Sequence, residues 1–444
     1  MSHLGMDVGT NAIKSVLIDN SGNIIFEKSV DYDIYYNNNY SEENPYDWIR
    51  GFKKILESLP ERPETMTFTG QMHTFVISGT DAEKPLRNAI LWSDFRGYKY
   101  SKFLIKKYVL KNLLNETGNY PLSNFTLLKL LWLKYNENDN FKKMKNAFIA
   151  KDFVKYYITK KKSTDVTDAS GTYILNARKR EWSDLFENLG IYGDLFGSLR
   201  ESHDTDSYYN GIEIKAGAGD QESSAVGMNI NNNDLGITLG TSGVVFKLLD
   251  EYKVPENKSL HLFCHAQKNK WHLMGVTQSG ALSLKWINNI LNLNFNDSEE
   301  MAKSSGPGSN DILFFPYLNG ERSPFNSGTV RASFTGLGSG NNRGYIIRSV
   351  MEGIAFNLRH VFISMNENAD KIIVSGGGAG SNLLLQIISD VFNKRIYSGN
   401  KNSTAYGASL IGLGKQLNSN YVKIFEPSEN SAIYQDLFEK YLRT

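Results

Sequence analysis

The stretch Gly5-Met6-Asp7-Val8-Gly9-Thr10-Asn11-Ala12-Ile13-Lys14 decides the fold predicted for this chain. Residues 3–6 and 14–19 have the composition of strands, and the glycine turn between them closes a hairpin. Residues 23–32 extend this hairpin with a third strand, and helical spacing over residues 45–59 follows. Strands that alternate with helices in this way predict an α/β protein.

The turn of this hairpin can also bind phosphate. A tight turn at Gly9 exposes backbone N–H groups, while Thr10 adds a hydroxyl and Lys14 a mobile positive charge. Asp7, at the end of the first strand, can hold a hydrated Mg²⁺. An ordinary hairpin turn is the alternative, because Asp, Gly and Thr are common turn residues.

The same pattern restarts near the middle of the chain. Strands predicted at 235–239 and 244–249 flank the turn Gly240-Thr241-Ser242-Gly243, in which Gly240 and Thr241 repeat the phosphate-binding chemistry. We interpret this as a weak internal repeat, with one copy opening each domain. The crossover is expected around 220–227, which predicts an N-terminal domain at 1–222 and a C-terminal domain at 223–444.

A third glycine-rich segment lies near the C-terminus. The strand Ile372-Ile373-Val374-Ser375 leads into Gly376, Gly377 and Gly378, and Ser381 precedes an expected helix. Glycines let the backbone lie flat against a ligand such as adenine or ribose. A strand-to-helix turn that needs positive φ is the alternative, although one glycine would serve that purpose.

Asp220 is the candidate general base. It follows the loop Ala216-Gly217-Ala218-Gly219 and precedes a small-residue helix expected at 223–227. Asp is also a preferred N-cap, so a purely structural role is the alternative, and Glu222 is a rival base. The segment Gly70-Gln71-Met72-His73 ends another predicted strand, where α/β proteins bind ligands. Its His and Gln can bond sugar hydroxyls, or the His can be structural.

Composition excludes several classes of protein. The 444 residues suffice for two or three domains, and the hydrophobic and charged fractions are ordinary for a soluble protein. The net charge of only +2 gives no broad positive surface, so the sequence does not predict binding to nucleic acid or to a membrane surface. Cys264 is the single cysteine, which excludes an internal disulfide. We find no secretory leader and no bilayer-spanning run, so a cytoplasmic location is expected.

Taken in order, these motifs resemble those of the FGGY carbohydrate kinases, within the sugar kinase and actin-like ATPase superfamily. Asp7-Val8-Gly9-Thr10 with Lys14 is similar to the first phosphate motif of the family, residues 239–243 to the second, and residues 376–378 to the adenosine motif. Phe315-Pro316-Tyr317-Leu318-Asn319-Gly320-Glu321-Arg322-Ser323-Pro324 resembles a highly specific family segment. Gly70-Gln71-Met72-His73, followed by Ile90-Leu91-Trp92-Ser93-Asp94, is similar to the sugar side of xylulokinases in that family.

The resemblance implies two ribonuclease-H-like domains that flank a cleft, and phosphoryl transfer from ATP with Mg²⁺ to a sugar hydroxyl. Asp220 matches the catalytic base. The implied sugar contacts are Gln71, Met72, His73, Trp92, Asp94 and Gln221. D-xylulose is the expected acceptor, and a homodimer is left open. Gln221 replaces the Asn usual in xylulokinases, so ribulose, sedoheptulose, erythritol and glycerol remain alternatives, as does a non-catalytic nucleotide-dependent sensor.

Overall fold

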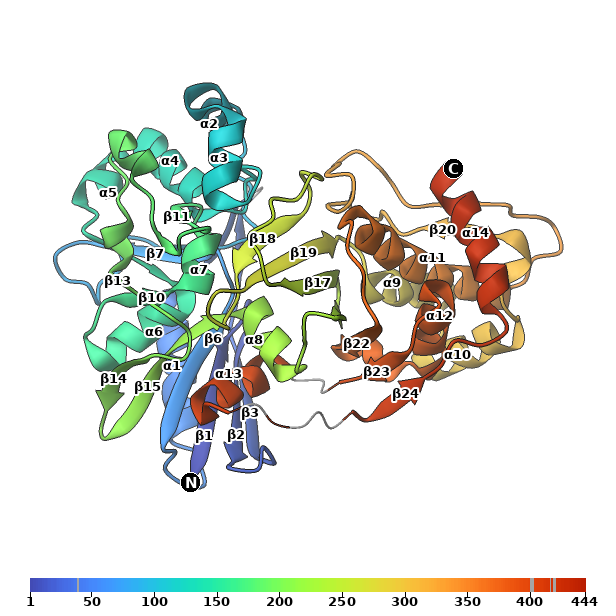
Figure 1. Cartoon of the computed structure of the whole chain (residues 1–444), viewed down its shortest axis with the longest axis horizontal. Coiled ribbons are helices and arrows are strands. Elements are labelled where there is room, and N and C mark those ends of the chain that lie inside the picture. The colour runs from blue at the N-terminus through green and yellow to red at the C-terminus, as the bar shows by residue number, and fades with distance from the viewer. Residues whose placement is uncertain (38–39, 400–402, 416, 418–420) are drawn as a thin grey trace.

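The computed structural model describes residues 1–37, 40–399, 403–415, 417 and 421–444. Two lobes lie side by side along the long axis of the molecule, and each is built on one large sheet (Figure 1). The strand order of the first sheet is β14-β15-β6-β1-β2-β3. Its strands are β1 (Ser2–Val8), β2 (Ala12–Asp19), β3 (Ile24–Asp31), β6 (Thr65–Gly70), β14 (Thr205–Tyr209) and β15 (Ile212–Gly219).

The second sheet repeats the topology of the first, in the order β18-β19-β17-β16-β22-β23-β24. β1 pairs antiparallel with β2 and parallel with β6, and β16 likewise pairs antiparallel with β17 and parallel with β22. The expected internal repeat and the α/β, ribonuclease-H-like class are therefore confirmed. The strands are β16 (Asp234–Leu239), β17 (Gly243–Leu249), β18 (His261–Cys264), β19 (Trp271–Thr277), β22 (Lys371–Ser375), β23 (Ile396–Ser398) and β24 (Lys423–Phe425).

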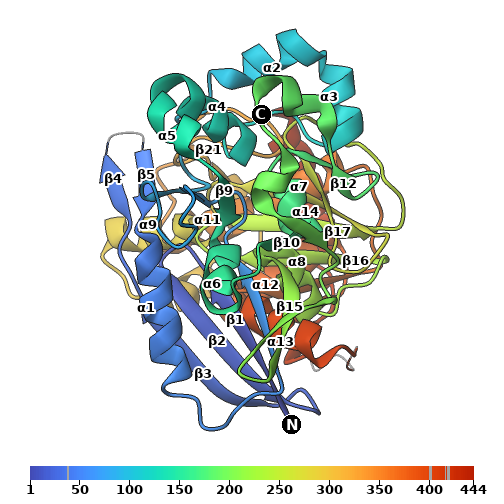
Figure 2. The ribbon, with the colours of Figure 1, turned by 90° about the vertical axis from the view of Figure 1, so that its left-hand side faces the viewer.

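The central strands of the first sheet carry apolar residues on both faces. Helices therefore cover both faces of the sheet. Leu17 joins the core beneath α1 (Pro45–Leu56) and α6 (Ala150–Thr159), and Figure 2 shows α1 lying along β2 and β3. Val16 and Ile18 face the other way and pack against α13 (Ser403–Leu413). A Cβ at Gly5 would stand 2.0 Å from the carbonyl oxygen of Ala405, so glycine is required where α13 crosses β1.

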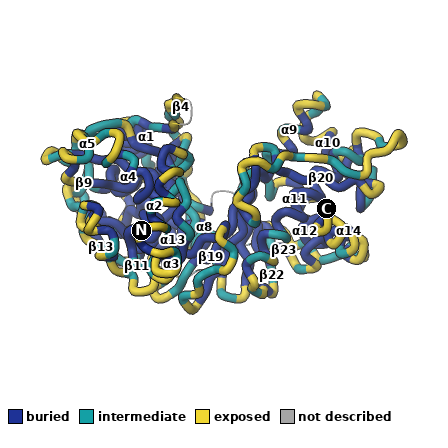
Figure 3. The backbone as a smooth tube through the Cα atoms, turned by 90° about the horizontal axis from the view of Figure 1, so that it is seen from above, coloured by how far each residue is buried: buried dark blue, intermediate teal, exposed yellow. Residues whose placement is uncertain are grey.

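The second sheet packs against α11 on one face and against the first lobe on the other. Ile237 and Val245 belong to the core around α11 (Arg343–Ser364), whereas Val244 and Phe246 share a core with first-lobe residues such as Phe125. In Figure 3 the lobes meet near α8 and β19 and diverge on one side. The remaining large helices of this lobe are α9 (Ala281–Leu291), α10 (Phe295–Ser304), α12 (Asn382–Phe392) and α14 (Ser431–Arg443).

The predicted helices differ from the structure in their boundaries. Residues 98–158 are mostly helical as expected, but β9 (Asn146–Ile149) interrupts them before α6. The helix expected at 223–227 is α8 (Asp220–Gly227), which begins three residues earlier. The other helices of this region are α2 (Tyr100–Tyr108), α3 (Leu110–Thr117), α4 (Thr126–Asn136) and α5 (Asn138–Lys143). Within the described ranges, no helix has both the length and the apolarity to cross a bilayer.

Candidate active site

A cavity of about 140 Å³ lies where the two lobes meet. It brings together Met72, His73 and Trp92 from the first lobe with Asp220 and Gln221 at the start of α8. The second lobe completes the wall. The residues that line the cavity without having been singled out from the sequence as contacts are Asn124, Ser242, Val244, His261, Met274, Val276 and Arg322.

Asp220 is the first residue of α8, directly after β15. The N-cap of this helix is Gly219, so the interpretation of Asp220 as the N-cap is wrong, and its side chain is available to a ligand. Burial raises the pKa of the Asp220 carboxyl to about 7, and the charge of nearby Asp7 adds to this effect. A carboxylate with a pKa near neutrality suits proton transfer.

A buried chain of hydrogen bonds holds the backbone N–H of Gly219, the residue before Asp220. The backbone N–H of Gly219 donates to Oγ1 of Thr167 at 2.7 Å, and this hydroxyl donates to Oδ1 of Asp165. Lys151 Nζ lies 2.7 Å from the other oxygen of Asp165, and both side chains are fully buried. Asp220 is therefore oriented by a network that lies outside the cavity.

Glu222, the rival base, lies in a different environment. Both carboxyl oxygens are buried without a hydrogen-bond partner among the described residues, and Glu222 does not line the cavity. Burial raises the pKa of Glu222 well above its usual value, and the charges of Asp220, Asp168 and Asp165 add to this rise. Because Glu222 lies outside the cavity that Asp220 lines, the geometry favours Asp220 as the base.

The two histidines of the cavity are neutral hydrogen-bonding groups. Burial lowers the pKa of His73 and of His261 to about 3. Nδ1 of His73 lies 2.6 Å from the carbonyl oxygen of Gly171, so it carries the proton and leaves Nε2 as an acceptor. Nδ1 of His261 lies 3.2 Å from Oδ1 of Asn119 and has the same tautomer. Both rings therefore offer Nε2 to a hydroxyl.

Gln221 adds a further acceptor, whereas two other expected sugar contacts do not reach the cavity. Oε1 of Gln221 is buried without a partner in the described structure. Gln71 instead donates to Glu43 and accepts from Thr74. The Asp94 carboxylate is fully buried and is satisfied by Arg96 and by the backbone N–H of Ser41. Internal hydrogen bonds thus use the polar groups of Gln71 and Asp94, and we leave both out of the proposed sugar contacts.

The first hairpin turn lies beside this cavity. Asp7 and Lys14 line a second cavity of about 280 Å³, and burial raises the pKa of Asp7 to about 6 while Lys14 lowers it. Oδ1 of Asp7 is buried without a hydrogen-bond partner in the described structure. A hard cation would supply the missing partner, so the residues present fit a Mg²⁺ ion.

A backbone hydrogen bond closes each hairpin turn, and the first turn is one residue longer than the second. The backbone N–H of Gly9 donates to the Ala12 carbonyl at 3.1 Å, and that of Gly240 donates to the Ser242 carbonyl at 2.9 Å. Thr10 extends from the first turn toward Trp92, whose indole N–H donates to the threonine hydroxyl. Thr241 lies at the exposed tip of the second turn.

The third glycine-rich segment lies in a separate cavity of about 310 Å³. Gly377, Gly378 and Ser381 line it together with residues of α9 and with Phe295. Gly376 has φ of 91°, and a Cβ there would stand 2.7 Å from the carbonyl oxygen of Leu239. The hydroxyl of Ser381 caps α12 and donates to Glu299 at 2.6 Å, so its side chain is engaged within the protein. The glycine backbone is left to face a ligand.

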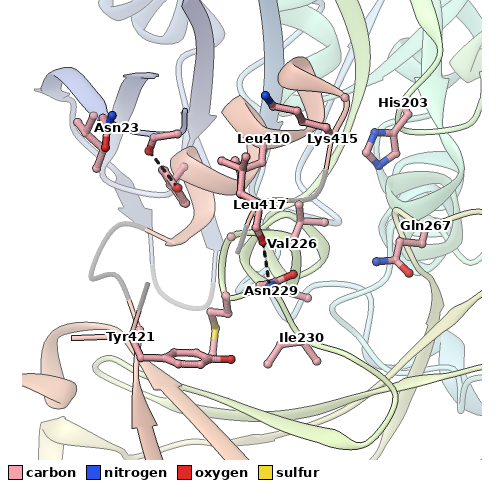
Figure 4. Close-up of a pocket in the computed structure, with 18 residues that line it drawn as sticks. Asn23, His203, Val226, Asn229, Ile230, Gln267, Leu410, Lys415, Leu417 and Tyr421 are labelled. Carbon is pink, nitrogen blue, oxygen red and sulfur yellow. Dashed lines mark hydrogen bonds between the residues drawn. The ribbon is translucent and has the colours of Figure 1, made fainter. Parts of the chain in front are cut away.

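A further cavity of about 580 Å³ lies beside α8 and α13 (Figure 4). Its wall contains His203, Gln267 and Lys415, and Asn229 donates to the Leu417 carbonyl at 3.2 Å. None of the site residues expected from the sequence lines it, and its described lining includes no carboxylate. It therefore offers no carboxylate base, in contrast to the cavity at Asp220.

Sequence and structure comparisons agree with this geometry. The chain matches the N-terminal domain of the FGGY family of carbohydrate kinases at 2–227 and the C-terminal domain at 235–414. It is 31% identical to a xylulose kinase of Staphylococcus xylosus, over 99% of this chain and 98% of that protein.

Two solved structures from Lactobacillus acidophilus are similar over nearly the whole chain. A ligand-bound xylulose kinase has a TM-score of 0.93 at 25% identity and covers 99% of this chain and 96% of its own. A gluconate kinase has the same TM-score and identity and covers 100% of this chain and 97% of its own.

The fold is that of the two-domain actin-like ATPases, with the Asp220 carboxylate in a cavity where the two lobes meet. The chain belongs to the FGGY family of carbohydrate kinases. It is a carbohydrate kinase, and its family implies a sugar and ATP as the two substrates.

Sequence reasoning missed Asn124, His261 and Arg322 as cavity residues. Arg322 stands in the segment 315–324 that resembled the family, but no local signal gave its side chain a role. His261 lies in an otherwise apolar strand, and the only indication of a role in the sequence is that a polar residue stands among apolar ones. Contacts between the lobes, which the sequence does not display, place both side chains in the cavity.

Proposed function

We propose that this enzyme transfers the γ-phosphoryl group of ATP, bound with Mg²⁺, to a hydroxyl of D-xylulose, giving D-xylulose 5-phosphate. The observation that carries the proposal is the placement of Asp220, with a pKa of about 7, in one cavity with Met72, His73 and Gln221. The similarity to xylulose kinases over nearly the whole chain supports the choice of sugar. We place the boundary between the two domains near 222, within α8.

Each group has a defined part in this reaction. Nε2 of His73 and Oε1 of Gln221 accept hydrogen bonds from sugar hydroxyls, and Asp220 orients the attacking hydroxyl and takes its proton. The turns at Gly9–Thr10 and Gly240–Thr241 bind phosphate oxygens, helped by Lys14, and the glycines at 376–378 face the adenosine. Mg²⁺ held at Asp7 would neutralise phosphate charge. Phosphoryl transfer depends chiefly on such positioning and charge stabilisation.

A gluconate kinase is the second candidate, because the solved gluconate kinase matches the chain as well as the xylulose kinase does. Other ketoses and polyols are further candidate substrates, because Gln221 is longer than the Asn usual in xylulokinases and would hold a polyol chain differently. A non-catalytic nucleotide sensor would have no use for the cavity at Asp220.

A coupled ADP-release assay over ketoses, aldoses, polyols and gluconate tests the proposal. We expect the highest kcat/KM with D-xylulose and negligible ADP release without a sugar. A tenfold or greater preference (about 1.4 kcal/mol) for gluconate or another sugar would reject D-xylulose but retain the kinase. ATP binding with no sugar-dependent turnover would favour the sensor.

A further inference from the structure

Arg322 brings a buried positive charge into the cavity at Asp220, where burial lowers the pKa of the guanidinium to about 10 and the charge of Glu321 offsets this effect only in part. It belongs to the connection between β20 (Leu313–Phe315) and β21 (Ser333–Thr335) of the second lobe. Among the described residues, no ion pair joins its guanidinium to a carboxylate, and its Nε is buried without a hydrogen-bond partner. A cation in such a place is costly unless an anion completes the site.

The acid nearest in sequence, Glu321, makes no ion pair with the guanidinium and offsets its charge only in part. Oε1 of Glu321 accepts the backbone N–H groups of Gln278 and Arg322, at 2.6 and 2.7 Å. Oε2 accepts from Nδ2 of Asn357 at 2.6 Å. These bonds fix the backbone of Arg322 while the Glu321 carboxylate is engaged elsewhere. The guanidinium is thus held in position and left free to bind a ligand.

The surroundings of Arg322 indicate which part of the ligand it meets. Its guanidinium carbon lies 5.5 Å from the centre of the Trp92 ring, across the boundary between the lobes. Trp92 donates to the hydroxyl of Thr10 in the first phosphate turn, and Ser242 of the second phosphate turn lines the same cavity as Arg322. Arg322 therefore shares the cavity with Asp220 and with Ser242 of the second turn, and Trp92 connects it to Thr10 of the first turn. The charge of Arg322 adds to the burial that lowers the pKa of His73 and His261.

We propose that Arg322 is a further catalytic residue, which pairs with the phosphoryl group as it passes from ATP to the sugar. In that step the bond from the sugar oxygen to phosphorus forms while the bond from phosphorus to the ADP oxygen breaks. The hydroxyl proton passes to Asp220. A guanidinium matches the equatorial oxygens with two parallel N–H donors and stabilises charge that the neutral sugar does not carry.

This inference rests on the proposed binding of sugar at Asp220. The carboxylate of a sugar acid such as gluconate is another source of an anion in the same cavity. The two sources are separable, because a carboxylate is present before the reaction and a transferred phosphoryl group only during and after it.

The experiment compares the full-length wild type with Arg322→Ala and Arg322→Lys, and with Arg331→Ala as the matched control. Arg331 is an exposed residue of the same connection, and among the described residues its guanidinium donates only to the carbonyls of Gly328 and Val330. Kinetics give kcat and KM for D-xylulose. Calorimetric titration gives affinities for D-xylulose, D-xylulose 5-phosphate and gluconate.

For Arg322→Ala we expect kcat to fall by ~10²–10³-fold, as on removal of one transition-state donor. D-xylulose affinity should change little, while affinity for the phosphorylated sugar should fall ~10–100-fold, as on loss of a charged hydrogen bond. Low-millimolar guanidinium should restore part of kcat in this variant. Arg322→Lys should have an intermediate kcat and an intermediate affinity for the phosphorylated sugar, because lysine keeps the positive charge but lacks the two parallel N–H donors of the guanidinium. Arg331→Ala should match the wild type.

Equal weakening of sugar and phosphosugar would overturn the inference in favour of a sugar contact, and an unchanged kcat would overturn it outright. Loss of gluconate binding with unchanged product affinity would assign the carboxylate instead. If Arg322→Ala misfolds, guanidinium will not restore its activity. The kcat and product affinity of Arg322→Lys then test the inference, and values equal to those of the wild type would overturn it. If the wild type does not use D-xylulose, the proposed function fails by itself, and the same ratios are measured with the sugar that is used.

Discussion

The indole Nε1 of Trp92 donates a hydrogen bond of 3.0 Å to Oγ1 of Thr10. This bond joins a wall of the proposed sugar cavity to the first phosphate turn, which lies more than 80 residues earlier in the chain. A sugar bound in the cavity can therefore influence the proposed phosphate turn through the Trp92 side chain alone.

Trp92→Phe should weaken this coupling. The variant keeps the aromatic face beneath Arg322 but loses the indole donor, and a neutral hydrogen bond is worth about 1 kcal/mol, or about fivefold in affinity. We expect sugar to improve ATP affinity less in Trp92→Phe than in the wild type, as measured by titration with and without D-xylulose. Trp286→Phe, in the core of the second lobe near Phe314, is the control and should keep the full effect. Undiminished coupling in Trp92→Phe would refute the link.

Asp220→Asn should remove the general base and leave the fold intact. We expect kcat to fall by ~10²–10⁴-fold, with sugar still bound, in the coupled ADP-release assay. Glu222→Gln is the matched control, because Glu222 is a buried carboxyl of the same helix that does not line the cavity, and glutamine keeps its shape. It should keep kcat within about tenfold. A larger loss of kcat in Glu222→Gln than in Asp220→Asn would instead identify Glu222 as the general base.

The activity should depend on pH through Asp220. Its pKa is raised from 3.8 to about 7, and only the ionised form accepts a proton. We therefore expect kcat/KM for the sugar to rise with pH up to about 7 and to level off above it. Asp220→Asn should lack this dependence. A rise centred near the ordinary aspartate pKa would contradict the assignment.

The same shift predicts a change in stability. The folded state holds the Asp220 proton more tightly than the unfolded chain, so stability is lost as pH rises from 3.8 through about 7. Asp220→Asn should therefore melt at a higher temperature than the wild type above about pH 7, and at the same temperature near pH 4. Calorimetric melting of both proteins across this range is the measurement. A lower Tm for Asp220→Asn at neutral pH would argue against a destabilising buried charge.

Thr167→Val should disturb Asp220 from outside the cavity. It leaves the N–H of Gly219 unbonded while keeping the shape of the side chain. A lost hydrogen bond of this kind costs ~1–3 kcal/mol, and we expect a fall in kcat of about tenfold with little change in KM. Thr67→Val is the control, since Oγ1 of Thr67 is buried without a partner in the described structure. Equal effects of the two variants would reduce Thr167 to a packing residue.

Gly376→Ala and Gly377→Ala form a matched pair in the third glycine segment. The first meets the Leu239 carbonyl and needs φ of 91°, whereas a Cβ at Gly377 meets nothing within 4 Å. We expect Gly376→Ala to lose ~1–3 kcal/mol of stability in denaturant unfolding. Gly377→Ala should fold normally and reveal in its ATP affinity whether the nucleotide contacts this face. Equal stability of the two variants would contradict the close approach at Leu239.

Much of the fold follows from local pattern. Short apolar segments bounded by glycine turns predict β1, β2, β16 and β17, because a strand turns successive side chains to opposite faces and both faces are covered here. The hairpin turns and the glycine segment at 376–378 were visible for the same reason, since their conformation depends on neighbouring residues. The order of the motifs then identified the family and singled out Asp220.

The tertiary structure alone decided which polar groups are free to meet a ligand. Gln71 and Asp94 stand in the expected motifs, yet partners from other segments use their hydrogen bonds. His261 and Arg322 reach the cavity from the second lobe, and Thr167 reaches the N–H of Gly219 from more than 50 residues away. A side chain's chemistry is written in the sequence, but its partners and its burial depend on which distant segments the fold brings against it.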